Sequence, residues 1–142
     1  MSDPAKILAI DDDPAVTDFL RAKLGESYAI VTTNEPAEAA ALARDELPDL
    51  ILCDVSMPQL DGYEVCRRIK AEAATRDIPV ILLTSSRAEA DDETRGFEAG
   101  AVDYVSKTLD RGVLDARLRL HLALRQAQHA MKNQNAQLEA KV

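Results

Sequence analysis

The sequence lacks tryptophan and has only two cysteines, Cys53 and Cys66, in 142 residues. There is no Cys-x-x-Cys pair, and only His121 and His129 could assist a thiol, so a cysteine-based metal site or a disulfide is disfavoured. Cys53 lies in an apolar run and Cys66 on a predicted helix, so we expect two buried thiols. Both histidines are expected to be solvated helix residues.

Positive charge is also scarce. Seventeen Lys and Arg stand against twenty-five Asp and Glu, which leaves a formal net charge of -8. A domain that binds nucleic-acid phosphates nonspecifically needs the opposite sign, so we expect no nucleic acid to bind this domain. No apolar stretch approaches the roughly 20 residues that span a bilayer, and the first residues lack a signal-peptide pattern. We therefore expect a cytoplasmic protein without membrane contact.

What the sequence does contain is an alternation of short apolar runs with longer amphipathic segments. The first amphipathic segment opens at Pro14 and stops at Gly25, the second opens at Pro36, and Asp61 caps the third. Strands that are apolar on both faces and separated by helices indicate a doubly wound α/β domain with a five-stranded parallel sheet. The predicted strands are residues 6–10, 28–32, 49–53, 79–83 and 102–106.

The end of the chain is a continuous helical pattern without glycine or proline. Leu124, Met131 and Leu138 recur every seven residues, which is typical of the start of a coiled-coil seam. We therefore predict one domain over residues 1–122 and a helical extension over residues 123–142. The extension is expected to dimerise or to connect to an output domain, and a solvated tail is the alternative.

Polar residues stand at the carboxyl ends of the predicted strands. Asp11 and Asp12 follow the first strand, Asp54 the third, Thr84 the fourth and Lys107 the fifth. Ligands of doubly wound folds bind outside the carboxyl ends of the strands. We therefore expect these side chains to converge on one rim of the sheet.

The three adjacent acids after the first strand need a compensating charge. Neighbouring carboxylates repel one another unless a cation or a helix terminus offsets them. Asp13 is the expected cap of the helix that opens at Pro14, which leaves Asp11 and Asp12 for the rim. Alternatively, all three are cap and surface residues. With Asp54, the pair matches the few carboxylates by which proteins usually hold Mg²⁺.

An aspartate beside such an ion is a plausible nucleophile toward phosphorus. The metal and a lysine neutralise charge on the transferring group while the carboxylate attacks in line. Asp54 is the candidate, because it alone follows a fully apolar strand into an irregular loop.

Together these motifs resemble the receiver domain of two-component response regulators. The segment Asp54-Val55-Ser56-Met57-Pro58-Gln59-Leu60-Asp61-Gly62 matches the family's D-x-x-M-P-x-x-D-G. Leu83-Thr84-Ser85 and the segment from Gly100 to Lys107 complete the set. The likeness spans roughly residues 5 to 120, and five motifs in order are far more specific than one. It implies a flavodoxin-like fold that signals through phosphorylation.

The resemblance implies that Asp54 accepts a phosphoryl group from a histidine kinase or a phosphotransfer protein, in a Mg²⁺-dependent step. It also implies that the metal is held by Asp11, Asp12, Asp54 and the backbone carbonyl of Ser56. By the same likeness, the domain is no enzyme beyond its own phosphorylation and dephosphorylation.

The resemblance further assigns the residues that respond to the phosphate. Thr84 and Lys107 contact the phosphoryl group, as a hydroxyl donor and a point charge. Tyr104, on the fifth strand, is expected to swing inward together with Thr84. One position departs from the family, because Thr108 follows Lys107 where proline is usual. A cis bond there would cost about 2.5 to 4 kcal/mol.

Two other functions fit less well. A haloacid-dehalogenase-like phosphohydrolase also uses aspartates after the first strand, but its D-x-D-x-T or V pattern would end here on Ala15. An unphosphorylated interaction module with the receiver fold is the other alternative, and the intact set of acids, Thr84 and Lys107 speaks against it. The long last helix resembles connectors that lead to cyclase, phosphodiesterase or kinase output domains.

Overall fold

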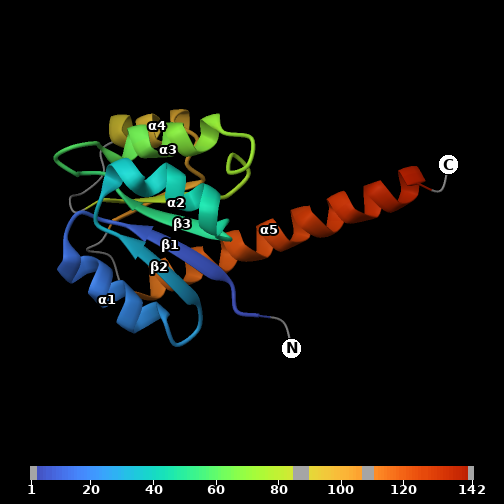
Figure 1. Cartoon of the computed structure of the whole chain (residues 1–142), viewed down its shortest axis with the longest axis horizontal. Helices are drawn as coiled ribbons and strands as arrows, with labels where there is room; N and C mark the ends of the chain where they lie inside the picture. Colours follow the sequence, from blue (N-terminus) through green and yellow to red (C-terminus); the bar gives the residue numbers. More distant parts are fainter. Residues whose placement is uncertain (1–2, 85–89, 107–110, 141–142) are drawn as a thin grey trace.

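A parallel sheet forms the centre of the domain (Figure 1). The computed structural model describes residues 3–84, 90–106 and 111–140, without the side chains of residues 90–93, 111 and 136–140. Within these residues the sheet has five strands in the order β2-β1-β3-β4-β5. They are β1 Lys6–Ile10, β2 Ala29–Thr33, β3 Leu50–Asp54, β4 Val80–Thr84 and β5 Asp103–Ser106. Each begins within one residue of its predicted start, so the predicted doubly wound fold is confirmed.

Helices connect the strands, as the alternating pattern predicted. Pro14 occupies the first turn of α1, and Gly25 follows its last residue. Pro36 opens a short 3-10 helix, η1, rather than α2 itself. The helical elements are α1 Pro14–Leu24, η1 Pro36–Glu38, α2 Ala39–Glu46, α3 Gly62–Ala71, α4 Ala90–Glu98 and α5 Arg111–Ala140.

The strands bury side chains on both faces, because helices cover each side of the sheet (Figure 1). Ile7 of β1 packs with α1 and α5, whereas the next residue, Leu8, packs with α2 and α3. Both predicted buried thiols, Cys53 and Cys66, are found in the second of these layers. The parallel arrangement brings the carboxyl ends of all the strands to one edge of the sheet.

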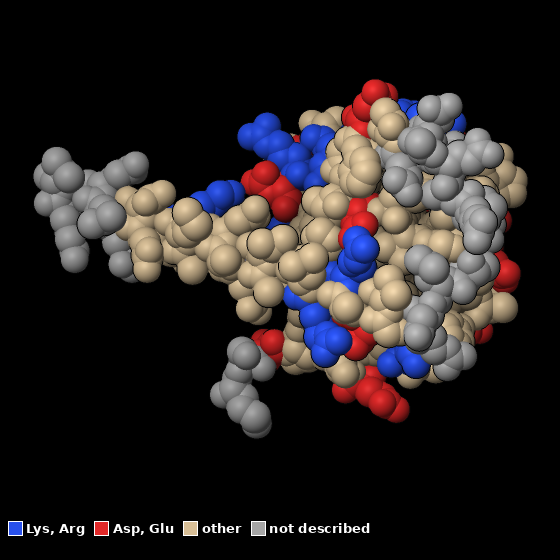
Figure 2. Space-filling view, turned by 180° about the vertical axis from the view of Figure 1, so that it is seen from behind, with Lys and Arg blue, Asp and Glu red and all other residues tan. Residues whose placement is uncertain are grey.

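Helix α5 is 30 residues long and continues past the opposite edge of the sheet (Figure 1). Leu118 and Leu122 are buried against the sheet, but Leu124 and Met131 are 50% and 63% exposed. Figure 2 shows that mostly uncharged side chains cover the projecting part of α5. No helix among the described residues is long and apolar enough to cross a membrane.

A buried carboxylate ties β5 to α5. Asp103 accepts two hydrogen bonds from Arg117, at 3.0 and 2.8 Å, and its Oδ2 lies 3.0 Å from Nε2 of His121. The expectation that both histidines are solvated is therefore wrong for His121, whose side chain is only 12% exposed, and right for His129. His121 sits one turn from Leu118 on the helix face that packs on the sheet, where Asp103 gives it a polar partner.

Candidate phosphoacceptor site

Three carboxylates meet at the carboxyl edge of the sheet. Asp11 follows β1 and Asp54 ends β3, and these two strands are paired neighbours. Carboxylate oxygens of Asp11, Asp12 and Asp54 lie within 4.8 Å of one another. Asp11 and Asp54 are only 2% and 4% exposed, whereas Asp12 is half-buried. The predicted convergence of these acids is therefore present.

Local hydrogen bonds separate Asp13 from this cluster. The Asp13 side chain accepts a hydrogen bond from the Ala15 amide at 3.0 Å and caps α1, as predicted. The Asp13 amide in turn donates to Oδ1 of Asp11 at 3.0 Å, and the Asp11 amide donates to the carbonyl of Thr33 at 3.2 Å. Hydrogen bonds therefore fix both the backbone of the acidic loop and the side chains of Asp11 and Asp13.

The cluster is electrostatically suited to a divalent cation. At an effective dielectric constant of about 20, two ionised carboxylates separated by about 5 Å repel by about 3 kcal/mol. The negative potential also reaches Cys53, whose thiol pKa is raised well above its usual value by burial and further by Cys66, Asp54 and Asp11. An all-oxygen set of this kind is what Mg²⁺ prefers, so the residues present fit that ion.

Gly62 allows the loop after β3 to fold back beside Asp54. Its amide donates to the carbonyl of Val55 at 2.9 Å. A Cβ at this position would lie 2.3 Å from the carbonyl oxygen of Asp54, so any side chain would force the backbone apart. Asp61, just before it, accepts a hydrogen bond from the Glu64 amide at 2.9 Å and caps α3, as predicted. This explains why an Asp-Gly pair stands seven and eight residues after Asp54.

A cavity of about 290 Å³ opens at the loop that begins with Val55, directly after Asp54. Thr84 ends β4, the strand next to β3, and its side chain is buried. Ser56 is exposed in the loop after β3. The residues that line the cavity are Val55, Ser56, Met57, Asp61, Tyr63, Thr84, Arg95 and Tyr104. The predicted Thr84, Ser56 and Tyr104 therefore share one hollow at the same edge as Asp54.

Tyr104 has a partner that the sequence did not reveal. Its hydroxyl lies 3.1 Å from the hydroxyl of Tyr63, at the start of α3. The guanidinium carbon of Arg95 lies 4.3 Å from the centre of the Tyr63 ring, a cation-π contact. Gly96 leaves room for the Tyr104 ring against α4, since a Cβ there would lie 3.0 Å from that ring. No local sequence pattern indicates that these two tyrosines, 41 positions apart, would meet.

Two further predictions concern residues outside the described part of the chain. Lys107, the expected cation of the site, and the bond from Lys107 to Thr108 both fall there.

Another contact that the sequence did not reveal is that of Asn34, which follows β2 directly and donates a hydrogen bond to the carbonyl of Asp11. The same rule that placed the acids at the strand ends would have placed Asn34 beside them.

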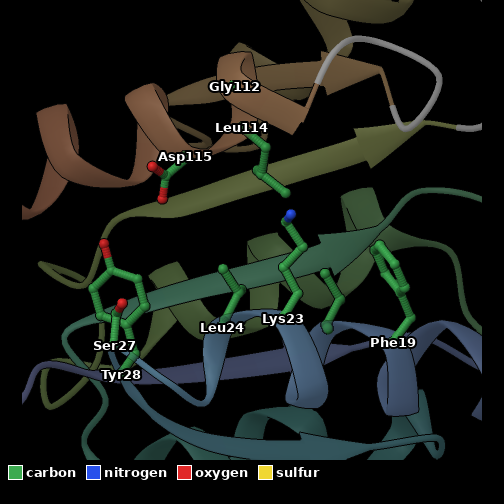
Figure 3. Close-up of a pocket in the computed structure, with 9 residues that line it drawn as sticks. Phe19, Lys23, Leu24, Ser27, Tyr28, Gly112, Leu114 and Asp115 are labelled. Atoms are coloured by element: carbon green, nitrogen blue, oxygen red, sulfur yellow. The ribbon is translucent and has the colours of Figure 1, made fainter.

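The other hollow of note lies between α1 and α5 and is separate from the acids (Figure 3). It measures about 270 Å³, and Phe19, Leu24 and Leu114 contribute to its apolar walls. Tyr28 stands at one end near Asp115 (Figure 3), and its pKa is raised by burial and by the charge of that carboxylate. No acid of the cluster lines this groove.

The sequence matches the response regulator receiver domain family over residues 7–119. The chain belongs to this family. It is 43% identical over 116 residues to the response regulator PleD of Caulobacter vibrioides, a match that covers 81% of this chain and 25% of PleD. It is also 38% identical over 136 residues to a Vibrio cholerae protein named "Probable cyclic di-GMP phosphodiesterase", covering 96% of this chain and 31% of that protein.

Solved receiver structures share the fold. The BeF3-activated receiver domain of RstA from Klebsiella pneumoniae superposes with a TM-score of 0.75 at 36% identity, covering 82% of this chain and 97% of that one. The receiver domain of a sensor histidine kinase from Pseudomonas aeruginosa, with magnesium in its active-site cleft, gives a TM-score of 0.76 at 29% identity and covers 84% and 98%.

Receiver domains are signalling domains that bind Mg²⁺ and interact with histidine kinases and phosphotransfer proteins. This family, and not the haloacid-dehalogenase-like alternative, is the one that the sequence matches. The receiver spans only a quarter to a third of the first two curated relatives.

Proposed function

We propose that Asp54 is the phosphoacceptor of this receiver and that Asp11 and Asp12 hold Mg²⁺ together with it. The observation that carries the proposal is the approach of the three carboxylates to within 4.8 Å, from two neighbouring strands. The magnesium in the cleft of the Pseudomonas relative and the BeF3-activated state of the Klebsiella relative support it by analogy. The backbone carbonyl of Ser56 is proposed as a further protein ligand beside the three carboxylates.

The donor is a phosphohistidine of a histidine kinase or a phosphotransfer protein. A carboxylate oxygen of Asp54 attacks the phosphorus in line, a P–O bond forms, and the P–N bond breaks with its electron pair passing to the imidazole nitrogen. Mg²⁺, when bound, neutralises charge on the phosphoryl oxygens. Asp11 and Asp12 would hold the ion at this position, and the Thr84 hydroxyl donates a hydrogen bond to a phosphoryl oxygen. Lys107 is proposed to supply the remaining positive charge.

The proposed chemistry is confined to the protein's own phosphate. Water later hydrolyses the acyl phosphate of Asp54, so the domain acts as a timed switch without an external substrate. An unphosphorylated interaction module is the competing function. It requires no metal at the cluster, so absence of a Mg²⁺-dependent shift in the NMR signals of Asp12 and Asp54 would favour it.

The helical extension is proposed to pass the signal on. We place the boundary between residues 1–122 and 123–142, and support comes from Leu122, the last buried side chain of α5 among the described residues. The match to the Vibrio protein covers nearly the whole chain, extension included.

The exposed Leu124 and Met131 suit a homodimer or a connector to an output domain. Light scattering before and after phosphorylation tests the dimer, and a monomer in both states would contradict it.

The acceptor is tested by labelling with acetyl phosphate. Wild type should gain one phosphoryl group only when Mg²⁺ is present, as measured by intact mass. Asp54→Asn should lose this labelling. Asp61→Asn is the matched control, because asparagine also caps a helix and Asp61 stands outside the cluster, and it should keep the labelling. Stable, Mg²⁺-dependent labelling of Asp54→Asn would overturn the assignment.

A further inference from the structure

The side chain of Asn34 reaches the acidic loop from the end of the neighbouring strand. Asn34 follows β2, and its Nδ2 donates to the backbone carbonyl of Asp11 at 2.8 Å. The same nitrogen donates to Oγ1 of Thr17 at 3.0 Å. One carboxamide thus joins the end of β2, the acidic loop and the first turns of α1.

The chemistry of the partners fixes which way this carboxamide points. A backbone carbonyl only accepts hydrogen bonds, so the group of Asn34 that faces Asp11 must be the NH₂ and not the oxygen. The Thr17 hydroxyl spends its own hydrogen on the carbonyl of Pro14, 3.1 Å away, so it accepts from Asn34. Thr17 is 3% exposed and Asp11 is 2% exposed, so both acceptors of the half-buried Asn34 side chain belong to buried residues.

The carbonyl that Asn34 holds is the one between the two proposed metal ligands. It belongs to the peptide unit that joins Asp11 to Asp12. Because a peptide unit is planar, fixing its carbonyl also fixes the direction in which the chain enters Asp12. The Asp13 amide already holds the Asp11 carboxylate at 3.0 Å. Asn34 in addition restrains the backbone peptide unit between Asp11 and Asp12.

We propose that Asn34 is a positioning residue for the magnesium site, holding the Asp11–Asp12 peptide so that both carboxylates are aimed at the ion before it binds. This inference rests on the proposed function of the acidic cluster. Asn34 itself donates no oxygen to the metal and acts through Asp11 and Asp12. Replacing Asn34 should therefore raise the Kd for Mg²⁺ clearly while the metal-free protein still folds.

The test compares Mg²⁺ affinity with stability in the metal-free protein. Isothermal titration calorimetry gives the Kd for Mg²⁺, and thermal unfolding without Mg²⁺ gives the cost to the fold. Asn34→Ala should raise the Kd about tenfold, at the low end of the effect of removing a hydrogen bond that orients a metal ligand. Should Asn34→Ala fail to fold, Asn34→Leu fills the same space without the hydrogen bonds and carries the same expectation.

Thr17→Val is the matched control. It removes the other acceptor of the Asn34 amide and leaves the bond to Asp11 in place. Thr17→Val should lower the melting temperature yet keep the Kd within about twofold of wild type, well below the cost of losing an orienting hydrogen bond.

The possible results distinguish a failure of the positioning role of Asn34 from a failure of the metal site itself. A wild-type-like Kd in folded Asn34→Ala would overturn the positioning role and leave the metal site intact. Equal rises in Kd for Asn34→Ala and Thr17→Val would also overturn it, because a general loosening of the loop would then explain both. Absence of Mg²⁺ binding by wild type would remove the metal site itself, and the inference with it.

Discussion

The hydroxyl groups of Tyr63 and Tyr104 lie 3.1 Å apart and join the start of α3 to β5 at the cavity that Val55 and Thr84 also line. Any rotation of the Tyr104 side chain that moves its hydroxyl away from Tyr63 must break this bond. A hydrogen bond of this type stabilises by about 1 kcal/mol, so Tyr63 holds Tyr104 in its present position by roughly that amount.

Tyr63→Phe should therefore make it easier for the Tyr104 ring to leave its present position. A loss of about 1 kcal/mol corresponds to a shift of about fivefold in the equilibrium between the two positions. The measurement is the NMR signal of fluorotyrosine incorporated at the three tyrosines, with and without acetyl phosphate. Tyr28→Phe is the control, since Tyr28 packs on the other face of the sheet. An unchanged Tyr104 signal in Tyr63→Phe would show that the bond does not restrain the ring.

Gly62→Ala should be strongly destabilising. The new Cβ would lie 2.3 Å from the carbonyl oxygen of Asp54, and both groups belong to backbone that cannot turn away cheaply. Forced overpacking of this kind costs about 1 to 3 kcal/mol, measured as the free energy of unfolding in urea. Gly96→Ala should cost less, because its close neighbours are the side chains of Tyr104 and Leu82. Equal costs for the two variants would contradict this account.

The strands and the acids could be predicted because their signals are local. An apolar run such as that of β3 identifies its strand, and the rule for parallel sheets then places Asp54 beside Asp11. The bond between Tyr63 and Tyr104 could not be predicted in this way, since the two residues are 41 positions apart and neither has an unusual local pattern. His121 was misjudged for the same reason, because its burial depends on Asp103 of another element.

Asp103→Asn should lower stability at neutral pH. Burial alone would raise the pKa of Asp103, but the hydrogen bonds from His121, Arg117 and the Tyr104 amide outweigh it and hold the pKa below its ordinary value of 3.8. Since the charged form is favoured in the folded state, its contribution is present above that value and is lost as the pH falls through the folded pKa. A hydrogen-bonded charge of this kind contributes about 1.5 to 3 kcal/mol.

The difference between wild type and Asp103→Asn should therefore be present at about pH 5 and shrink as the pH falls toward about 3. Urea unfolding at these pH values measures it. Asp115→Asn is the control, because the Asp115 side chain is 50% exposed and, among the ion pairs that the structure describes, it pairs only with Arg119 at 3.5 Å. A difference that persists undiminished at low pH would show that packing, not charge, makes Asp103 stabilising.

Arg125 fixes the point at which α5 leaves the domain. Its guanidinium donates to the carbonyl of Asp77 at 2.9 Å and lies 3.9 Å from the carboxylate of Asp49, so it spans the loops before β4 and β3. The side chain is only 15% exposed. Beyond it, Lys132 adds an exposed ion pair to Asp77 at 3.4 Å, which is weaker because water screens it.

Arg125→Ala should loosen the extension without unfolding the receiver. Hydrogen exchange of the amides in residues 123–135 should become faster, whereas exchange in β1 and β3 should remain at the wild-type rate. Arg119→Ala is the matched control, since the Arg119 side chain is 69% exposed on the same helix, and it should leave both regions unchanged. If the extension carries the signal of Asp54 outward, a loosened exit from the domain should also weaken any phosphorylation-dependent change in residues 123–135. Unchanged exchange there would mean that Arg125 has no part in directing the helix.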